Sequence, residues 1–224
     1  MKIILGYLFK IINILIYNIS IENMLSSIKK NSRELRETVL QNIIHMLIDR
    51  KFLNTKNKQH YLTEIKKKIT SEDISFNSDY DHPYIINIKF LTENNVGKKQ
   101  NLVKILDYTN KKNHYVLIVI DNKVNKFLKD FKRISNIEIF NYSEFFLNVT
   151  DHQLVPKHTI LTQSEKEEVL KQYNCSIEQI PKLWKTDRIA RHYNMQPGSI
   201  CKIERISEVT GKAITYRHVV LGAL

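Results

Sequence analysis

The chain of 224 residues is poor in cysteine, glycine and proline, and each shortage excludes a class of protein. Its two cysteines, Cys175 and Cys201, are too few for a disulfide scaffold and lack the spacing of metal ligands. Five glycines and four prolines exclude collagen-like and linker-rich chains. The sequence contains no Walker A, G-x-G-x-x-G, G-x-S-x-G or H-E-x-x-H motif. It therefore predicts a protein without catalytic residues, metal, cofactor or small-molecule substrate.

Positive charge is what the chain has in excess. Lys and Arg number 35 against 23 Asp and Glu, a net charge of +12, which favours a polyanionic partner. Residues 24–150 contain 22 basic and 14 acidic side chains, and residues 151–224 contain 11 and 8. Lysines are point charges without base-reading geometry, so DNA contacts should be independent of sequence and sensitive to salt. The alternative is a set of solvated surface lysines, inflated by the codon bias of an AT-rich genome.

The first 21 residues are strongly apolar and allow three interpretations. A membrane-spanning helix needs about 20 apolar residues, and here Lys10, Asn13 and Asn18 interrupt the run. A signal peptide needs a small-residue cleavage site, which the sequence lacks at this point. A regular soluble pattern follows. We therefore expect residues 1–23 to be an apolar extension outside the native fold, and we expect no membrane partner.

Hydrophobic spacing predicts a first domain over residues 24–149. Helices are expected at 24–52, 61–69, 101–108 and 124–131, and strands at 84–90, 115–120 and 137–139. The first of these strands alternates, with Asn87 and Lys89 on its exposed side, whereas the second is apolar throughout and suits burial on both faces. The order β-α-β-α-β predicts an α/β layer with parallel strands.

Residues 150–224 predict a smaller α+β domain. Capping boxes at Thr162 and Ser176 begin a helix and a short turn, and Asp187 can cap a further short helix. Strands are expected at 200–206 and 213–220. Cys201 lies in the first of these strands and is expected in the core. The whole chain is thus predicted to be α+β, with its domain boundary at the start of this smaller domain.

One group of residues resembles a nuclease site. Asp79 and Asp81 precede Asn87-Ile88-Lys89 with the layout of a PD…(D/E)xK enzyme, in which two acids hold Mg²⁺. Asn87 replaces the second acid, and an amide is a poorer ligand for a hard cation. A Mg²⁺-dependent nuclease-like enzyme using Asp81 and Lys89 is therefore an alternative. The simpler interpretation is a pair of loop acids and a lysine that faces solvent.

Asp151, His152 and His158 form a second polar cluster, to which Cys175 could be added as a metal ligand. Their spacing matches no zinc pattern. We expect these histidines to form hydrogen bonds within a turn beside Pro156.

The smaller domain carries a series of motifs in a fixed order. They are DHQLVPKH at 151–158, QIPKL at 179–183, DRIARHY at 187–193, GSICKI at 198–203, SEVTG at 207–211 and YR at 216–217. The series resembles the fifth-largest-subunit family of eukaryotic RNA polymerases, which polymerases I, II and III share and whose archaeal relative has only the second domain. Residues 33–52 are similar, more loosely, to the opening helix of that family. Many ordered matches over about 70 residues are more specific than one short motif.

Two departures from the family pattern, Arg188 after Asp187 and Ile206 before Ser207, indicate a divergent member from a large DNA virus or an AT-rich protist. The protein is accordingly expected in the nucleus if it is cellular, or in a viral factory or virion if it is viral.

The resemblance implies a non-catalytic subunit of a DNA-directed RNA polymerase. Its second domain would dock on the largest subunit, among other polymerase subunits, and its first domain would form a nuclease-like jaw along downstream double-stranded DNA. The candidate subunit-interface residues are His152, Pro156, His158, Arg191, Tyr216 and Arg217. The candidate DNA contacts are Lys98, Lys99, Lys123 and Lys126. A third hypothesis, a membrane-anchored basic adaptor, rests entirely on residues 1–21.

Overall fold

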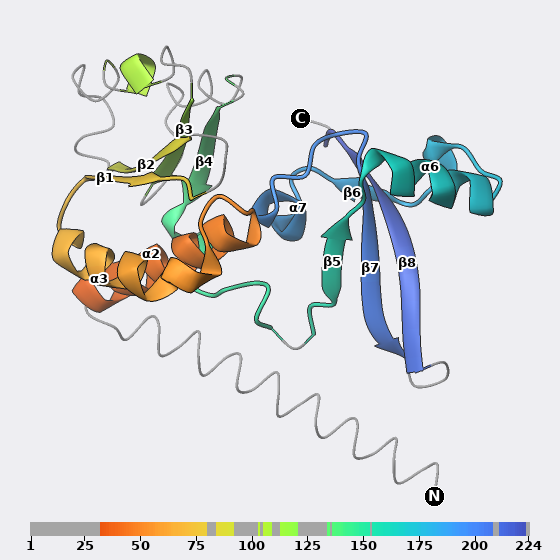
Figure 1. Ribbon diagram of the computed structural model, residues 1–224, viewed down its shortest axis with the longest axis horizontal. Coiled ribbons are helices and arrows are strands. Elements are labelled where there is room, and N and C mark those ends of the chain that lie inside the picture. Colours follow the sequence, from red (N-terminus) through yellow and green to blue (C-terminus); the bar gives the residue numbers. More distant parts are fainter. Residues whose placement is uncertain are drawn as a thin grey trace, which may run out of the picture. The chain divides into compact units, whose positions relative to one another are not determined.

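The chain divides into two compact units, Met1–Leu147 and Asn148–Leu224. The computed structural model describes residues 32–79, 84–91, 103, 105–108, 113–120, 134, 136–152, 154–207 and 211–222. Within these residues each unit contains helices and a four-stranded sheet (Figure 1). The predicted α+β class is therefore confirmed.

A four-stranded sheet in the order β1-β2-β3-β4 lies at the centre of the first unit. Its strands are β1 (Asp73–Asn77), β2 (Ile85–Leu91), β3 (His114–Ile120) and β4 (Ile137–Asn141). β2, β3 and β4 run parallel, as predicted, so their carboxyl ends lie at the same edge of the sheet. β1 pairs antiparallel with β2 and was not predicted, because only Ile74 and Phe76 among its residues are apolar.

Helices cover one face of this sheet and form the main core with it (Figure 1). The helical segments are α2 (Ser32–Asp49), η1 (Thr55–Asn57), α3 (Lys58–Lys68) and η2 (Tyr142–Phe145). α2 buries Val39, Ile43 and Leu47 at the predicted spacing of four residues. α3 buries Tyr61 and Ile65 against the same core.

The opposite face of the sheet contains buried polar side chains. The prediction that Asn87 and Lys89 lie on an exposed side is wrong, since they are only 4% and 1% exposed. Lys89 Nζ donates to Asp73 Oδ1 at 2.9 Å, and Asn87 Oδ1 accepts a hydrogen bond from Ser75 Oγ at 2.9 Å. Both partners come from β1, so the ammonium and the amide are satisfied without facing water.

The second unit has a sheet in the order β5-β7-β8-β6. Its strands are β5 (Lys157–Ile160), β6 (Lys182–Trp184), β7 (Ile200–Ser207) and β8 (Gly211–Val220), and its helical segments are α6 (Gln163–Gln172), η3 (Ile177–Gln179) and α7 (Arg188–His192). β7 and β8 are the two predicted strands and pair antiparallel. β5 and β6 were not predicted, because three or four residues are too few to establish a period.

The predicted helix caps of the second unit are confirmed. Thr162 and Glu165 form the capping box of α6, and Ser176 and Gln179 form that of η3. The Asp187 carboxylate accepts a hydrogen bond from Ile189 N at 2.8 Å at the start of α7.

Several predictions lie outside the described residues. These are the apolar extension at 1–23, the helix at 124–131, Asp81 and all four candidate DNA-contacting lysines. Among the residues that the structure does describe, no helix is both long enough and apolar enough to cross a membrane.

Candidate subunit interface

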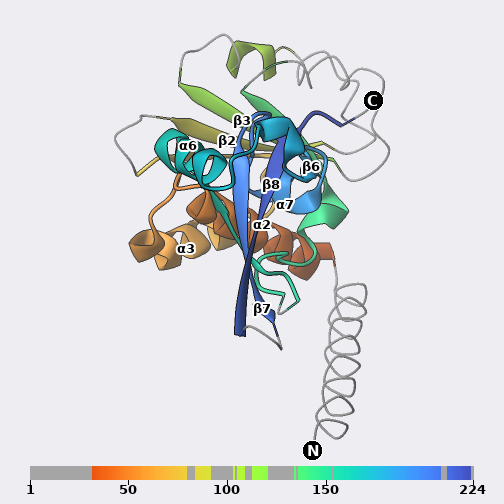
Figure 2. The same cartoon turned by 90° about the vertical axis from the view of Figure 1, so that its right-hand side faces the viewer.

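The sheet of the second unit carries a helix on each of its two faces (Figure 2). α7 contributes Ile189 and Ala190 to a core that also contains Cys201 and Val219 of the sheet. Cys201 is fully buried, as predicted, and burial raises the pKa of its thiol to about 11. α6 lies over the other face, where the Tyr173 ring meets that of Tyr216 from β8, 5.8 Å apart.

Two of the predicted interface residues lie on the α7 face. His158 in β5 is opposite Ile203, and Arg217 in β8 is opposite Cys201. Because directly paired residues share a face, both side chains flank the α7 core. Arg217 is exposed and donates to the Lys182 carbonyl at 3.1 Å, while Arg191 is half-buried on α7 itself.

His152 and Pro156 belong to a hydrogen-bonded turn that leads into β5, as predicted. The His152 carbonyl accepts from Val155 N at 2.8 Å, and its ring Nδ1 accepts from Leu154 N at 3.2 Å. The ring of His158 in turn lies 2.7 Å from the Pro156 carbonyl. In the part of the chain that the structure describes, no group of His, Cys, Asp and Glu side chains could hold a metal ion.

Tyr216 lies apart from the other predicted interface residues, because its side chain points to the α6 face. It belongs to a row of apolar side chains, which we call the hairpin patch: Tyr173, Tyr216, Ile214 and Ile206. Ile214 is paired with Glu204, so it shares that face with Ile206, two residues further along β7. The exposed fractions are 58% for Tyr173, 45% for Ile214 and 94% for Ile206.

The apolar members of this patch were missed at the sequence level. A signal was nevertheless present, because both isoleucines share a strand face with charged residues. Glu204 on that face binds Lys202 and Lys212, each at 2.8 Å, and these two ammonium groups lower the pKa of Glu204 to about 2. Residues two apart in a strand share a face, so an apolar residue on the same face as these ions is expected to face solvent or a partner.

The geometry of the described residues in the first unit does not support the nuclease alternative. The Asp79 carboxylate accepts hydrogen bonds from the Tyr61 hydroxyl and, at 2.7 Å, from Asn54 N. Lys89 is instead paired with Asp73, whose position in β1 is separated from Asp79 by the length of that strand. The described members of the proposed site are therefore engaged in separate structural contacts.

Comparison with known proteins gives the chain its family. The family model for the C-terminal domain of RNA polymerase Rpb5 matches residues 147–219. The DNA-directed RNA polymerases I, II, and III subunit rpabc1 of Dictyostelium discoideum is 34% identical over 194 residues, which cover 82% of this chain and 94% of that protein. The chain belongs to the Rpb5 family of RNA polymerase subunits. Its Caenorhabditis elegans relative, subunit RPABC1, is 40% identical over 84 residues, covering 38% of this chain and 40% of that protein.

Membership of the Rpb5 family confirms the resemblance carried by the ordered motifs. The match to the Dictyostelium protein is too long to be confined to the second unit, so it also includes sequence from the first. A more distant Rpb5-family relative, subunit 5B of DNA-directed RNA polymerases IV and V in Arabidopsis thaliana, is 32% identical over 105 residues, 46% of this chain and 48% of that protein. The chain is a non-catalytic polymerase subunit, and the nuclease alternative is wrong.

Proposed function

We propose that this Rpb5-family chain docks on the largest subunit of a nuclear RNA polymerase through residues 150–224, beside other polymerase subunits. We further propose that residues 24–149 form a jaw that guides downstream duplex DNA. The Dictyostelium and Caenorhabditis relatives are subunits of RNA polymerases I, II and III, which supports the assembly role and a nuclear rather than a viral setting. The divergent protist origin stays a proposal that rests on composition and on the departures from the family motifs.

The hairpin patch is the observation that supports docking most strongly. Ile206 is 94% exposed and Ile214 is 45% exposed on the same face of a small unit. Neighbouring apolar side chains that remain exposed on a soluble domain commonly mark a protein–protein contact. Tyr173 and Tyr216 extend the same surface with aromatic rings, which are enriched at interface centres.

Docking is tested by affinity purification of the tagged chain from its native source, with quantitative mass spectrometry of its partners. The wild type should recover the largest polymerase subunit at near-equal stoichiometry. Ile206→Asp should reduce that recovery about tenfold or more, since it places a charge in a desolvated contact. Gln172→Asp, which adds the same charge at an exposed position of α6, is the matched control and should leave recovery unchanged. Equal recovery with both variants would refute a role for the hairpin patch.

The DNA-guiding role is supported by charge, since residues 24–150 hold 22 basic against 14 acidic side chains. Binding of a fluorescent duplex should be independent of sequence and should weaken steeply as salt rises. A Lys123→Gln, Lys126→Gln variant should lower the slope of log affinity against log salt by roughly 1–2. Lys182→Gln, Lys185→Gln removes the same charge from the second unit and should change the slope little. Affinity that does not respond to salt would overturn this part of the proposal.

A further inference from the structure

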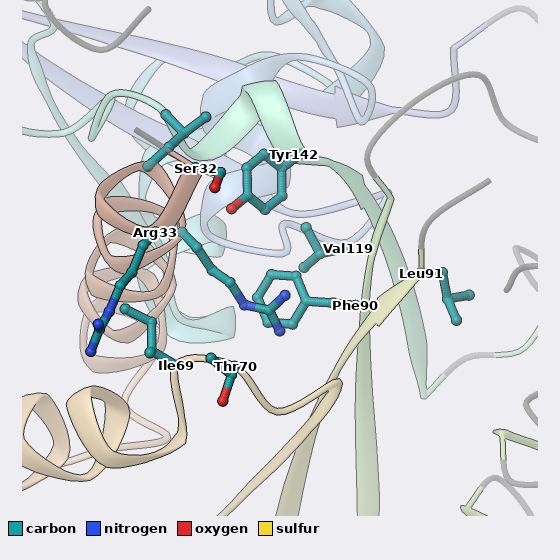
Figure 3. Close-up of a pocket in the computed structure, with 10 residues that line it drawn as sticks. Ser32, Arg33, Ile69, Thr70, Phe90, Leu91, Val119 and Tyr142 are labelled. Atoms are coloured by element: carbon teal, nitrogen blue, oxygen red, sulfur yellow. The ribbon is translucent and has the colours of Figure 1, made fainter. Parts of the chain in front are cut away.

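A cavity of about 460 Å³ opens in the first unit, at the edge where the parallel strands end (Figure 3). α2 forms one side of it, and the turn after α3, with Ile69 and Thr70, forms another. Phe90 near the end of β2, Val119 near the end of β3 and Tyr142 just after β4 complete its walls. In open α/β sheets the carboxyl ends of parallel strands are the usual location of ligand sites. Among the described residues, none of the hairpin patch lines this cavity.

Arg36 of α2 provides the cavity with a positively charged group. Its guanidinium lies over the Phe90 ring, 4.2 Å from the centroid, and donates to the Ser71 carbonyl. Its Nε is buried and finds no hydrogen-bond acceptor among the described residues. Burial lowers the pKa of Arg36, so the surroundings disfavour its charge more than they compensate it. Arg36 as a whole is half-buried and lines the cavity, so its guanidinium offers a positive charge to a ligand there, while Nε itself is enclosed.

The charges around the cavity favour an anion. Arg33, which is exposed, also lines the cavity from α2. Among the described residues, the Tyr142 hydroxyl and, more weakly, the Glu72 carboxylate attract the Arg36 guanidinium and oppose the lowering of its pKa. Among the described lining residues, the formally charged ones are the two arginines. A stacked arginine is also suited to bind a carboxylate or phosphate with two parallel hydrogen bonds.

The apolar walls decide between the possible anions. Leu35, Ile69, Phe90 and Val119 line the same space as the arginines, so a fully hydrated phosphodiester would leave most of the wall without contacts. A rigid DNA duplex is also too wide to enter a cavity of this size, whereas one large side chain fits within it. We propose that the cavity binds an acidic segment of a partner protein, with one bulky apolar side chain between Phe90 and Ile69 and a neighbouring carboxylate on Arg36. This inference goes beyond polymerase assembly and can fail without affecting it.

The test is fluorescence anisotropy with the full-length chain and three labelled peptides of equal length. The first alternates Asp and Glu with Phe and Leu, the second replaces every Phe and Leu by Ser, and the third replaces every acid by Lys. Only the first should bind saturably, with the others weaker by about tenfold or more. Two variants should each weaken binding of the first peptide about tenfold. Arg36→Gln removes the positive charge that would bind the peptide carboxylate, and Thr70→Trp fills the cavity from its exposed rim. Arg205→Gln removes an exposed arginine from the second unit and should change affinity less than about twofold.

Three outcomes would overturn the proposal. If the serine peptide binds as tightly as the first peptide, and Thr70→Trp does not change this, the positively charged chain attracts any acidic peptide. Displacement of the first peptide by inorganic phosphate at similar concentration would mean a phosphate site. Absence of saturable binding by any peptide would mean no such site. Thermal melting of each variant verifies folding, and if Arg36→Gln unfolds the chain, Arg36→Lys together with Thr70→Trp decides the question.

Discussion

Among the described residues of the first unit, the ion pair between Arg50 and Glu138 should be the strongest single polar contact. The two side chains form a bidentate pair, with both N–O distances at 2.9 Å and exposed fractions of 2% and 18%. Arg50 also donates to the Tyr115 hydroxyl at 2.7 Å. Arg50 follows directly after α2 and Glu138 lies in β4, so the pair joins the end of the helix to the edge of the sheet.

Removing one partner leaves the other charge desolvated without compensation. We expect Arg50→Met to lower the free energy of unfolding by about 3–5 kcal/mol and Glu138→Gln by about 2–3 kcal/mol. The double variant should lose about 2 kcal/mol less than the sum of the two single losses, because neither charge then remains. With a urea slope near 1.5–3 kcal/mol/M, the Arg50→Met midpoint should fall by roughly 1–3 M.

Urea unfolding followed by circular dichroism measures these values, since urea does not screen the pair as a salt would. The pair between Lys66 and Glu37, 3.6 Å apart with side chains 65% and 31% exposed, is the control, and Glu37→Gln should cost less than about 1 kcal/mol. Trp184, the one tryptophan of the chain, lies in the second unit, so its fluorescence transition should keep its midpoint. A coupling energy below about 0.5 kcal/mol, equal to that of a surface pair, would refute the reasoning.

Three further predictions concern single groups. At pH 8 iodoacetamide should alkylate the half-buried Cys175, while the fully buried Cys201 should stay unmodified until the chain unfolds. Mass spectrometry measures the two rates of alkylation, and equal rates would contradict this prediction. Thr162→Ala removes the capping box of α6 and should cost about 1 kcal/mol in urea, read from tryptophan fluorescence. Burial and a hydrogen bond to Asp79 raise the pKa of Tyr61 from 10 to about 12, so the unfolded chain releases this proton first and stability falls between pH 10 and 12. Tyr61→Phe should make that fall shallower, and an unchanged pH profile would argue against the shift.

The long elements of this fold follow from hydrophobic spacing alone. α2 repeats Val39, Ile43 and Leu47 on one side, and β3 is apolar throughout, so each could be predicted with its burial. The strands that were not predicted, β1, β5 and β6, are three to five residues long and lie at the edges of their sheets. Such strands form because a neighbour offers backbone hydrogen bonds, and a short local pattern does not contain that information.

Buried charges were beyond prediction for a related reason. An alternating pattern places a lysine such as Lys89 on the solvent side, since a charge inside a protein is costly unless it is paired. Its partner Asp73 is 16 residues away, and the partner of Arg50 is 88 residues away. The local sequence around a charged residue does not reveal which carboxylate the fold will bring to it.

Different residues make up the family motifs and the surface that would bind a partner. Asp187 caps α7, Gly198 adopts a φ of +88° that disfavours side chains, and Ile203 is buried, so these motif positions specify the fold of the second unit. Ile206, in contrast, departs from the family pattern and is 94% exposed. Ile206 lies with Ile214 and the two tyrosines in the hairpin patch, and a group of exposed apolar side chains of this kind is what a contact with another protein would cover. The partner surface that faces Ile206 should then be particular to the polymerase of this chain. A polymerase assembled from a relative's subunits should therefore bind the Ile206→Ser variant no more weakly than it binds the wild-type chain.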